Sequence, residues 1–488
     1  MNENLPVACK TEMTDAKLKL LMCFPPTNYH PSPQLLLKMT MLLVLLFLLM
    51  GCGVAQSSKL VRVSPLLFTG EDTQEEEDCS AAQPRKSSTS IPLMHLQAKC
   101  SPFRNNDSTW LTAVLESIKG DEQRYRAITG AATTSFTTQE DAGVPLAVKN
   151  GEYVINLGFG TPKQSFYTLL DTGSDITWIP CDSGSLFDPS RSSTYKYLTC
   201  SSQTCQAFGS TPTCGNYNCS IKQTYGDGSQ VLVLLSTDSL AVGSQSMPGF
   251  IFGCAKARTG LITSTPGLVG FGRESFSFVS QTANLFQKTF SYCIPSSTST
   301  GCLALGKSAL SSSALQFTSL LTNSANPSFY YVGLNGVSVG EDRVAVPAMG
   351  QSSGKGTIID SGTTITRLAE PAYSSVRDSF VRHLSKFSRA ASVSIFDACF
   401  NFPSGDVEVP QITLHFDNNV DVPLPPTNYL IRTSAQGSVI CLALAAPPKS
   451  SSGSGESILG NFQQRNFRVV YDIPGSRLGI APQSCKGC

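Results

Sequence analysis

Two stretches of this sequence read alike: Leu-Leu-Asp-Thr-Gly-Ser at residues 169–174 and Ile-Ile-Asp-Ser-Gly-Thr at residues 358–363. Each begins with apolar residues that favour a buried strand, and each continues with an Asp, a small hydroxyl residue and a Gly that allows a sharp turn. The Asp therefore stands where a strand leaves the core. A single Asp-x-Gly is common turn chemistry. Two copies predict two similar lobes that place Asp171 and Asp360 in a shared cleft.

Further motifs accompany both stretches in a fixed order. An apolar-apolar-Gly element follows each of them, at residues 268–270 and 458–460, and a Gly-rich hairpin tip at residues 225–229 lies ahead of the first element. With these motifs the chain resembles the pepsin-type aspartic endopeptidases, in particular the secreted plant branch that includes the nepenthesin-like enzymes. The resemblance begins at about residue 151. It implies an all-β, bilobal pepsin-like fold, with two similar β lobes around a central cleft and few short helices.

The resemblance also implies roles for individual residues. Asp171 and Asp360 would be a catalytic pair that shares one proton: the ionised carboxylate activates a water, and the protonated one polarises the scissile carbonyl. Support of the two catalytic loops is implied for Thr172, Gly173, Ser174, Ser361, Gly362 and Thr363. The flap would include Tyr225 and Gly226, and Trp178 stands where the family has a Trp that meets the flap tyrosine. The resemblance implies no cofactor and no metal.

Composition narrows the compartment and the partners. A formal net charge of +1 gives no sign of a nucleic-acid partner or an anionic membrane surface. The 17 cysteines are many for a reducing compartment, so they indicate the secretory pathway. We expect polypeptide substrates, a monomer without a membrane anchor, and a location outside the cell, in the apoplast, or in the vacuole.

The start of the chain is typical of a secretory protein. Lys38 precedes a short apolar run and a group of small residues, so residues 1–55 are predicted to be a signal peptide. Residues 1–38 would then be an upstream extension, with Met39 or Met41 as an alternative start. The apolar run is too short for a membrane span, which needs about 20 residues.

Residues 56–140 are predicted to form the pro-region of a zymogen. They contain an acidic run at residues 71–78 and apolar residues at helical spacing over Trp110–Ile128. A disordered linker is the alternative. The two catalytic lobes are predicted to follow as residues 141–325 and 326–488.

The cysteines of the predicted lobes are interpreted as disulfide bridges. The symmetrical spacing of four of them suggests two nested bridges, Cys200–Cys219 and Cys205–Cys214. By the resemblance, Cys399 pairs with Cys441 and Cys293 with Cys485. The plant enzymes have partners for Cys181 and Cys254 in a stretch that this chain lacks after Cys181, so we expect these two to bond to each other; two free thiols are the alternative. Asn106 and Asn218 begin glycosylation sequons.

Other functions fit the sequence less well. A Gly-x-Ser-x-Gly match at residues 336–340 is followed by β-like sequence rather than by the helix that a nucleophile elbow needs, and His415 has the pattern of a structural strand residue. A catalytically weak or inactive inhibitor or binding protein on the same fold is the main rival, although both Asp loops are intact. A glycosidase would not explain the paired loops. The family usually has Gly at the position of Val233, and this departure leaves the flap geometry open.

Overall fold

A computed structural model covers the whole chain. It describes residues 8–10, 22–24, 59–64, 90–104 without 97 and 99, 110–128, and 153–485 without 182–186, 209–211, 216, 226–228, 264, 296–299, 313, 348–355, 434–437 and 449–455. Residues 1–58 and 59–488 are two separate units. In the first, β1 (Ala8–Lys10) and β2 (Met22–Phe24) pair as antiparallel strands, and the rest of the predicted signal peptide lies outside the described residues. Among the described residues, no helix has the length and apolar character of a membrane span.

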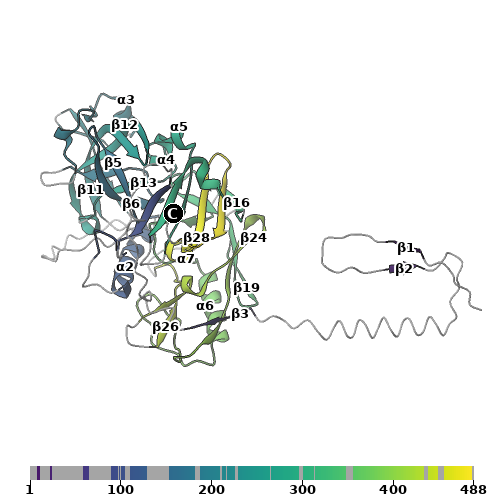
Figure 1. The fold of residues 1–488 in the computed structure, drawn as a ribbon. Helices are drawn as coiled ribbons and strands as arrows, with labels where there is room; N and C mark the ends of the chain where they lie inside the picture. Colours follow the sequence, from purple (N-terminus) through teal and green to yellow (C-terminus); the bar gives the residue numbers. More distant parts are fainter. Residues whose placement is uncertain are drawn as a thin grey trace, which may run out of the picture. The chain divides into compact units, whose positions relative to one another are not determined.

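The second unit is built mostly from β-strands (Figure 1). Its N-terminal lobe contains a long antiparallel hairpin of β11 and β12, with a bulge between Leu232 and Val233. The strands of this lobe are β5 (Tyr153–Phe159), β6 (Gln164–Asp171), β7 (Trp178–Pro180), β8 (Lys196–Tyr197), β9 (Thr213–Gly215), β10 (Asn218–Thr224), β11 (Gln230–Val242), β12 (Gln245–Thr259) and β13 (Leu268–Gly270). Its short helices are α3 (Gln203–Gln206), α4 (Phe278–Gln281) and α5 (Ala283–Phe286).

The C-terminal lobe divides its strands among smaller groups. One group consists of β17 (Tyr330–Val332), β20 (Thr357–Ile359) and β27 (Ile458–Leu459). A four-stranded sheet has the order β19 (Asp342–Ala345), β18 (Leu334–Val339), β23 (Ile412–Phe416) and β24 (Val420–Pro423). A three-stranded sheet has the order β21 (Cys399–Asn401), β26 (Val439–Leu442) and β25 (Leu430–Arg432). The helices are α6 (Ala372–His383) and α7 (Asn461–Gln464).

Strands from both halves of the chain pair directly and join the lobes. β14 (Thr289–Cys293) pairs with β28 (Phe467–Asp472), which pairs with β29 (Arg477–Pro482), which in turn pairs with β16 (Gln316–Leu321). β15 (Thr300–Leu305) extends this sheet beyond β14. The two lobes therefore share one continuous sheet.

The predicted pro-region contributes three ordered elements to the same unit. β3 (Leu60–Val63) pairs with β22 (Val407–Pro410) of the C-terminal lobe. β4 (Ser90–His95) lies between β15 and β5 and pairs with both. The helix α2 spans Trp110–Ile128, as its apolar spacing predicted. The alternative of a disordered linker is therefore wrong for these three segments.

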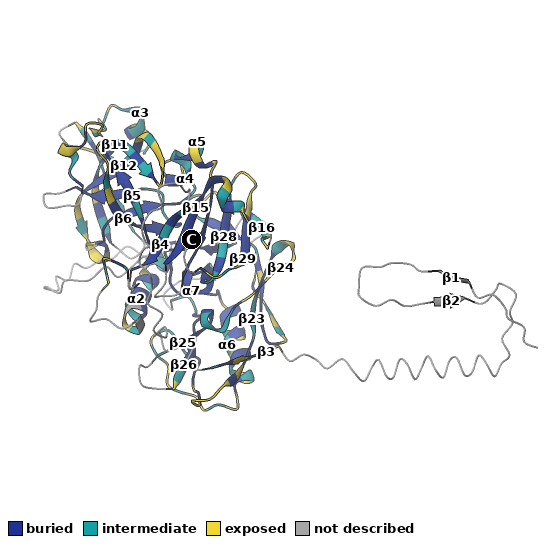
Figure 2. Cartoon of the chain, viewed as in Figure 1, coloured by how far each residue is buried: buried dark blue, intermediate teal, exposed yellow. Residues whose placement is uncertain are grey.

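The core follows from the alternation of apolar and polar residues along the strands. Strands whose two faces are both covered read as apolar runs: the end of β6 from Thr168 to Asp171 is buried throughout, as is all of β20. Figure 2 shows buried strands in the interior and exposed residues on the outer loops. Each Asp of the paired motifs thus follows a buried strand, as the apolar residues before it predicted.

Five disulfides each join two described cysteines, and Cys100 and Cys302 are disulfide-bonded as well. The structure bonds Cys181 to Cys254, Cys293 to Cys485 and Cys399 to Cys441. The nested pairing predicted for the other four is wrong, because the bonds are Cys200–Cys214 and Cys205–Cys219. Both real loops have a separation of 14 residues, so the symmetrical spacing does not distinguish crossed from nested bridges. Burial decides between them, since α3 places Cys205 inside the lobe beside the equally buried Cys219.

Candidate active site

Each candidate catalytic Asp is positioned by a parallel strand pair. β13 runs parallel to β6, with Gly270 opposite Asp171, and β27 runs parallel to β20 beside Asp360. The glycines that end the two apolar-apolar-Gly elements permit a close crossing. A Cβ on Gly270 would lie 2.3 Å from the carbonyl carbon of Asp175, and one on Gly460 would lie 2.6 Å from the carbonyl oxygen of Thr364. Both elements therefore need Gly where they cross a catalytic loop.

The two carboxylates have the same local hydrogen bonds. Asp171 accepts from the backbone N–H of Gly173 at 3.0 Å and from the hydroxyl of Ser174 at 2.5 Å. Asp360 accepts from the backbone N–H of Gly362 at 3.0 Å and from the hydroxyl of Thr363 at 2.7 Å. Both Asp residues are buried. These donors fix the orientation of each carboxylate, as the sequence motif implied.

The two loops also brace each other. The backbone N–H of Thr172 donates to the hydroxyl of Ser361 at 3.2 Å, and the N–H of Ser361 donates to the hydroxyl of Thr172 at 2.9 Å. The Ser361 hydroxyl in turn donates to the carbonyl of Leu170 at 3.3 Å. Because all three contacts are buried and the first two are reciprocal, the lobes hold the two Asp residues in register.

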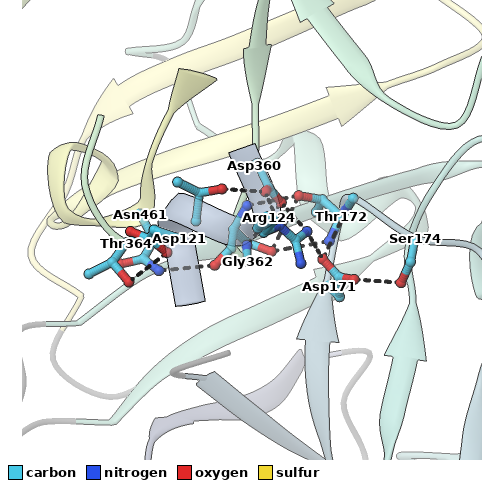
Figure 3. A network of polar contacts seen from close by, with 12 residues as sticks. Asp121, Arg124, Asp171, Thr172, Ser174, Asp360, Gly362, Thr364 and Asn461 are labelled. Atoms are coloured by element: carbon cyan, nitrogen blue, oxygen red, sulfur yellow. Dashed lines mark hydrogen bonds and ion pairs between the residues drawn. The ribbon is translucent and has the colours of Figure 1, made fainter. Parts of the chain in front are cut away.

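One guanidinium from the predicted pro-region lies between the two carboxylates (Figure 3). The Nη2 of Arg124, on α2, donates to Asp171 Oδ1 at 2.7 Å and to Asp360 Oδ1 at 3.1 Å, and its Nε donates to Asp360 Oδ2 at 2.8 Å. Burial alone would lower the pKa of Arg124, but the two carboxylates outweigh it and hold that pKa above its ordinary value. Arg124 thus neutralises part of the charge of the Asp pair and occupies the place between them.

A second side chain of α2 binds the loop that follows Asp360. Asp121, one turn before Arg124, accepts from the backbone N–H groups of Thr364 and Ile365 at 3.0 Å, and from the hydroxyl of Thr364 at 3.2 Å. Figure 3 shows Asp121 and Arg124 directed at neighbouring parts of the same loop. The helix is therefore fixed to the site by one acidic and one basic residue.

The predicted flap residues lie beside the first lobe's core. The indole N–H of Trp178 donates to the hydroxyl of Tyr225 at 2.6 Å, so the expected pair is in contact. Gly226 lies outside the described residues. Val233 is buried, and the position of its side chain is possible because Gly253 lies opposite: a Cβ there would be 2.7 Å from that of Val233. The departure at Val233 is therefore accommodated by a glycine on the facing strand.

Of the two predicted glycosylation sites, only Asn218 is described. It lies half-buried in β10, next to the disulfide-bonded Cys219. Asn106 lies outside the described residues. No group of three or more metal-type side chains is found in the part of the chain that the structure describes.

The Gly-x-Ser-x-Gly match does not form a nucleophile elbow. Ser338 lies within β18, buried, and its Oγ is 2.7 Å from Nε2 of His415, whose Nδ1 is 2.6 Å from Asp421 Oδ1. These contacts imitate a Ser-His-Asp triad. However, β18 pairs with a strand on each side, so its backbone N–H groups serve the sheet rather than an oxyanion hole. The arrangement has the features of a structural network.

Comparison with known proteins agrees with this geometry. Family models described as "Xylanase inhibitor N-terminal" and "Xylanase inhibitor C-terminal" match residues 153–307 and 329–482. Aspartyl protease AED3 of Arabidopsis thaliana is 36% identical over 445 residues, which cover 86% of this chain and 96% of the relative. This chain belongs to the plant pepsin-type aspartic protease family.

Other members of the family support the assignment. Aspartic proteinase nepenthesin-1 of Nepenthes gracilis is 41% identical over 356 residues, covering 69% of this chain and 78% of the relative. Among solved structures, basic 7S globulin from soybean superposes with a TM-score of 0.58 at 25% identity, covering 69% of this chain and 94% of the globulin. The fold is thus the bilobal pepsin-like fold that the paired motifs predicted.

For this member of the family, sequence reasoning missed the two side chains that α2 directs at the site. The apolar spacing of Trp110–Ile128 identified the helix, but it says nothing about the partners of Asp121 and Arg124. A usable signal was their spacing: three residues apart, they lie on one face of a helix. A basic residue on the helical face of a segment that precedes an acidic cleft is a candidate partner for that cleft.

Proposed function

We propose that this chain is the precursor of a secreted aspartic endopeptidase, which hydrolyses peptide bonds with water activated between Asp171 and Asp360. The observation that carries the proposal is the matched environment of the two carboxylates: each accepts one backbone N–H and one hydroxyl, from loops that brace each other. Identical donors on two buried carboxylates suit a pair that works on one water molecule.

The chemistry follows from groups that this chain supplies. With Arg124 gone, two like charges held together favour one shared proton. The ionised carboxylate accepts a proton from the water as it attacks the scissile carbonyl carbon, and the protonated carboxyl donates to the carbonyl oxygen. The nitrogen of the leaving amine is then protonated as the bond breaks. The N–H groups of Gly173 and Gly362 keep the carboxylate orientation constant throughout. No covalent intermediate forms, because the water oxygen itself bonds to the scissile carbon.

The proposal includes a zymogen stage. Arg124 fills the place of the attacking water and pairs with both carboxylates, so the precursor cannot carry out the reaction while α2 is bound. Arg side chains do not deprotonate in proteins. Release therefore depends on protonation of the carboxylates at acid pH or on cleavage of the segment that carries α2. Disulfides and the predicted signal peptide support a secretory location.

An inhibitor or binding protein on the same fold is the second candidate, and the names of the two matching family models favour it. A protein that only binds has no need of two carboxylates with matched donors. The presence of a guanidinium clamped between them also favours a site that must be kept inactive. We therefore place the protease first.

Proteolysis by the purified precursor tests the proposal. The precursor is incubated with a denatured protein substrate from about pH 2 to 7, a range that brackets the working pH of shared-proton Asp pairs, with and without pepstatin. We expect pepstatin-sensitive cleavage at acid pH, and none from Asp171→Asn or Asp360→Asn, each of which removes half of the pair while keeping its shape. Turnover by either variant, or none by the parent chain, would show that the proposal is wrong.

A further inference from the structure

The loop after Asp360 holds a carboxylate in a specific set of donors. Asp121 is 4% exposed and receives hydrogen bonds from two successive backbone N–H groups, those of Thr364 and Ile365, as well as from the Thr364 hydroxyl. Such convergence of donors on one anion is the geometry that stabilises a carboxylate. The donors belong to the body of the molecule, whereas the carboxylate belongs to α2.

A buried cation follows these donors closely along the chain. Arg367 is 1% exposed; its Nη1 donates to the carbonyl of Ala446 at 2.7 Å, while Nε and Nη2 have no hydrogen-bond partner among the described residues. Glu122 Oε1 of α2 lies 4.0 Å from its Nη2. Burial lowers the pKa of Arg367, and Asp121 and Glu122 act against that lowering. The carboxylates that balance this charge thus come from the segment that must leave.

The position of these groups connects them with the reaction. Thr364 is four residues after Asp360 and directly follows Thr363, whose hydroxyl donates to the Asp360 carboxylate. A ligand held at Thr364 and Ile365 therefore lies next to the Asp pair, in the space that α2 fills (Figure 3). When α2 departs, a buried guanidinium and three aligned donors lose their acidic partners, which is unfavourable until another acceptor replaces them.

We propose that in the activated enzyme this carboxylate pocket, formed by Thr364, Ile365 and Arg367, binds an acidic side chain of the polypeptide substrate. The inference rests on the proposed function, because it concerns substrates of the same Asp pair. It makes the enzyme selective for polypeptides with Asp or Glu at one fixed position near the scissile bond. Asp121 would then fill a substrate subsite for as long as α2 is bound.

Cleavage-site profiling tests the pocket. The full chain is activated at acid pH, then incubated at about pH 5, where a free carboxyl side chain is ionised, with a peptide library, and the cut sites are read by mass spectrometry. We expect Asp and Glu to be enriched over Asn and Gln at one position. For a matched peptide pair, kcat/KM should favour the acidic peptide about tenfold, the size expected for charge-assisted hydrogen bonds.

Two variants assign the preference to the pocket. Arg367→Gln removes the cation, and Thr364→Val removes one hydroxyl while keeping the shape; the second remains informative if the first does not fold. Each should lower the acidic-to-amide ratio of kcat/KM, which does not depend on the amount of active enzyme. Arg382→Gln removes an equal charge at an exposed site and should leave the ratio unchanged.

The outcomes separate the two proposals. Pepstatin-sensitive cleavage without any acidic preference, or a preference that neither pocket variant changes, would overturn the carboxylate pocket and leave the protease assignment standing. Absence of all pepstatin-sensitive cleavage would overturn the protease assignment, and the pocket with it.

Discussion

Arg124 is the residue on which the state of the site depends. Its guanidinium keeps its charge at any pH in the working range. Only the charge of the carboxylates can therefore change with pH. The two ion pairs hold α2 at the site and cover both carboxylates. Under the proposed function, loss of these ion pairs is the step that frees the site.

Replacing Arg124 by Gln should loosen this contact. The change removes the charge from a largely buried ion pair, which typically costs about 3 kcal/mol or more, so α2 should leave at higher pH. We expect the variant precursor to cleave a quenched peptide, or to shorten, at a pH where the parent precursor is inactive. Lys119→Gln, at an exposed position of the same helix, is the matched control. Identical pH profiles for Arg124→Gln and the parent chain would contradict the role given to this residue.

Asp175, four residues after Asp171, gives a prediction about stability. Burial raises its pKa, against hydrogen bonds from the hydroxyl of Ser328 and the N–H of Glu274 that lower it. A carboxyl with a raised folded-state pKa favours folding below the unfolded value of about 4 and loses that contribution as pH rises through the folded value. Asp175 thus stabilises the fold at acid pH and destabilises it at neutral pH.

Asp175→Asn should remove that liability, since the amide oxygen can accept from the N–H of Glu274 and the amide NH2 can donate to the Ser328 hydroxyl, without a buried charge. We expect the melting temperature at pH 7 to rise and that at pH 3 to stay about the same, so that the difference between the two narrows. Asp378→Asn, on the exposed side of α6, should leave this difference unchanged. A parallel fall at both pH values would mean that the carboxylate is needed for packing rather than destabilised by burial.

At the scale of elements, the apolar pattern predicted the positions of helices and strands well. The partners of Cys200 and Cys205 and of charged side chains such as Arg124 were not predicted well. The boundaries of α2 and the strands that lead to Asp171 and Asp360 follow from local periodicity, because helix and strand formation depends on nearby residues. The bridges of Cys200 and Cys205, by contrast, depend on how α3 packs against the hairpin of β9 and β10. The contacts of Arg124 with Asp residues far along the chain have the same long-range character. Local periodicity does not determine the partners in tertiary contacts of this kind.

The Cys181–Cys254 bridge permits a quantitative test. It ties the end of β7, the strand that contains Trp178, to β12 across a separation of 73 residues. In the chain-entropy model, a loop of that length contributes about 4 kcal/mol, and the 14-residue loop of Cys200–Cys214 about 3 kcal/mol. Replacing both cysteines of each pair by Ala should lower the free energy of unfolding by roughly these amounts, in this order, as measured in urea. A smaller loss for the longer loop would argue against the model.

At the scale of the whole second unit, the predicted pro-region contacts both lobes. It pairs with the C-terminal lobe through β3, joins the shared sheet through β4, and contacts both catalytic loops through α2. Apolar side chains strengthen the last contact: Val114 and Ile118 pack against Ile365 and Phe462. Cleavage of a single peptide bond after α2 would leave all of these contacts in place.

We therefore expect a pro-segment cut between residues 133 and 151 to stay bound at neutral pH. Gel filtration at pH 7 followed by mass spectrometry should find both fragments in one peak, and the same analysis at about pH 3 should separate them, because acid in general weakens ion pairs between carboxylates and Arg side chains. The uncut precursor provides the size standard. Separation at pH 7 would show that covalent continuity, rather than the contacts of β3, β4 and α2, retains the segment.

The place of β4 bears on the lifetime of the mature form in the proposed zymogen scheme. The strand is an interior member of its sheet, bonded to β5 on one edge and β15 on the other, so the chain folds around a segment that the proposed maturation would detach. A matured molecule that unfolded would have to refold without that strand, with two strand edges open to aggregation. We therefore expect its persistence to depend on the unfolding rate rather than on the folding equilibrium.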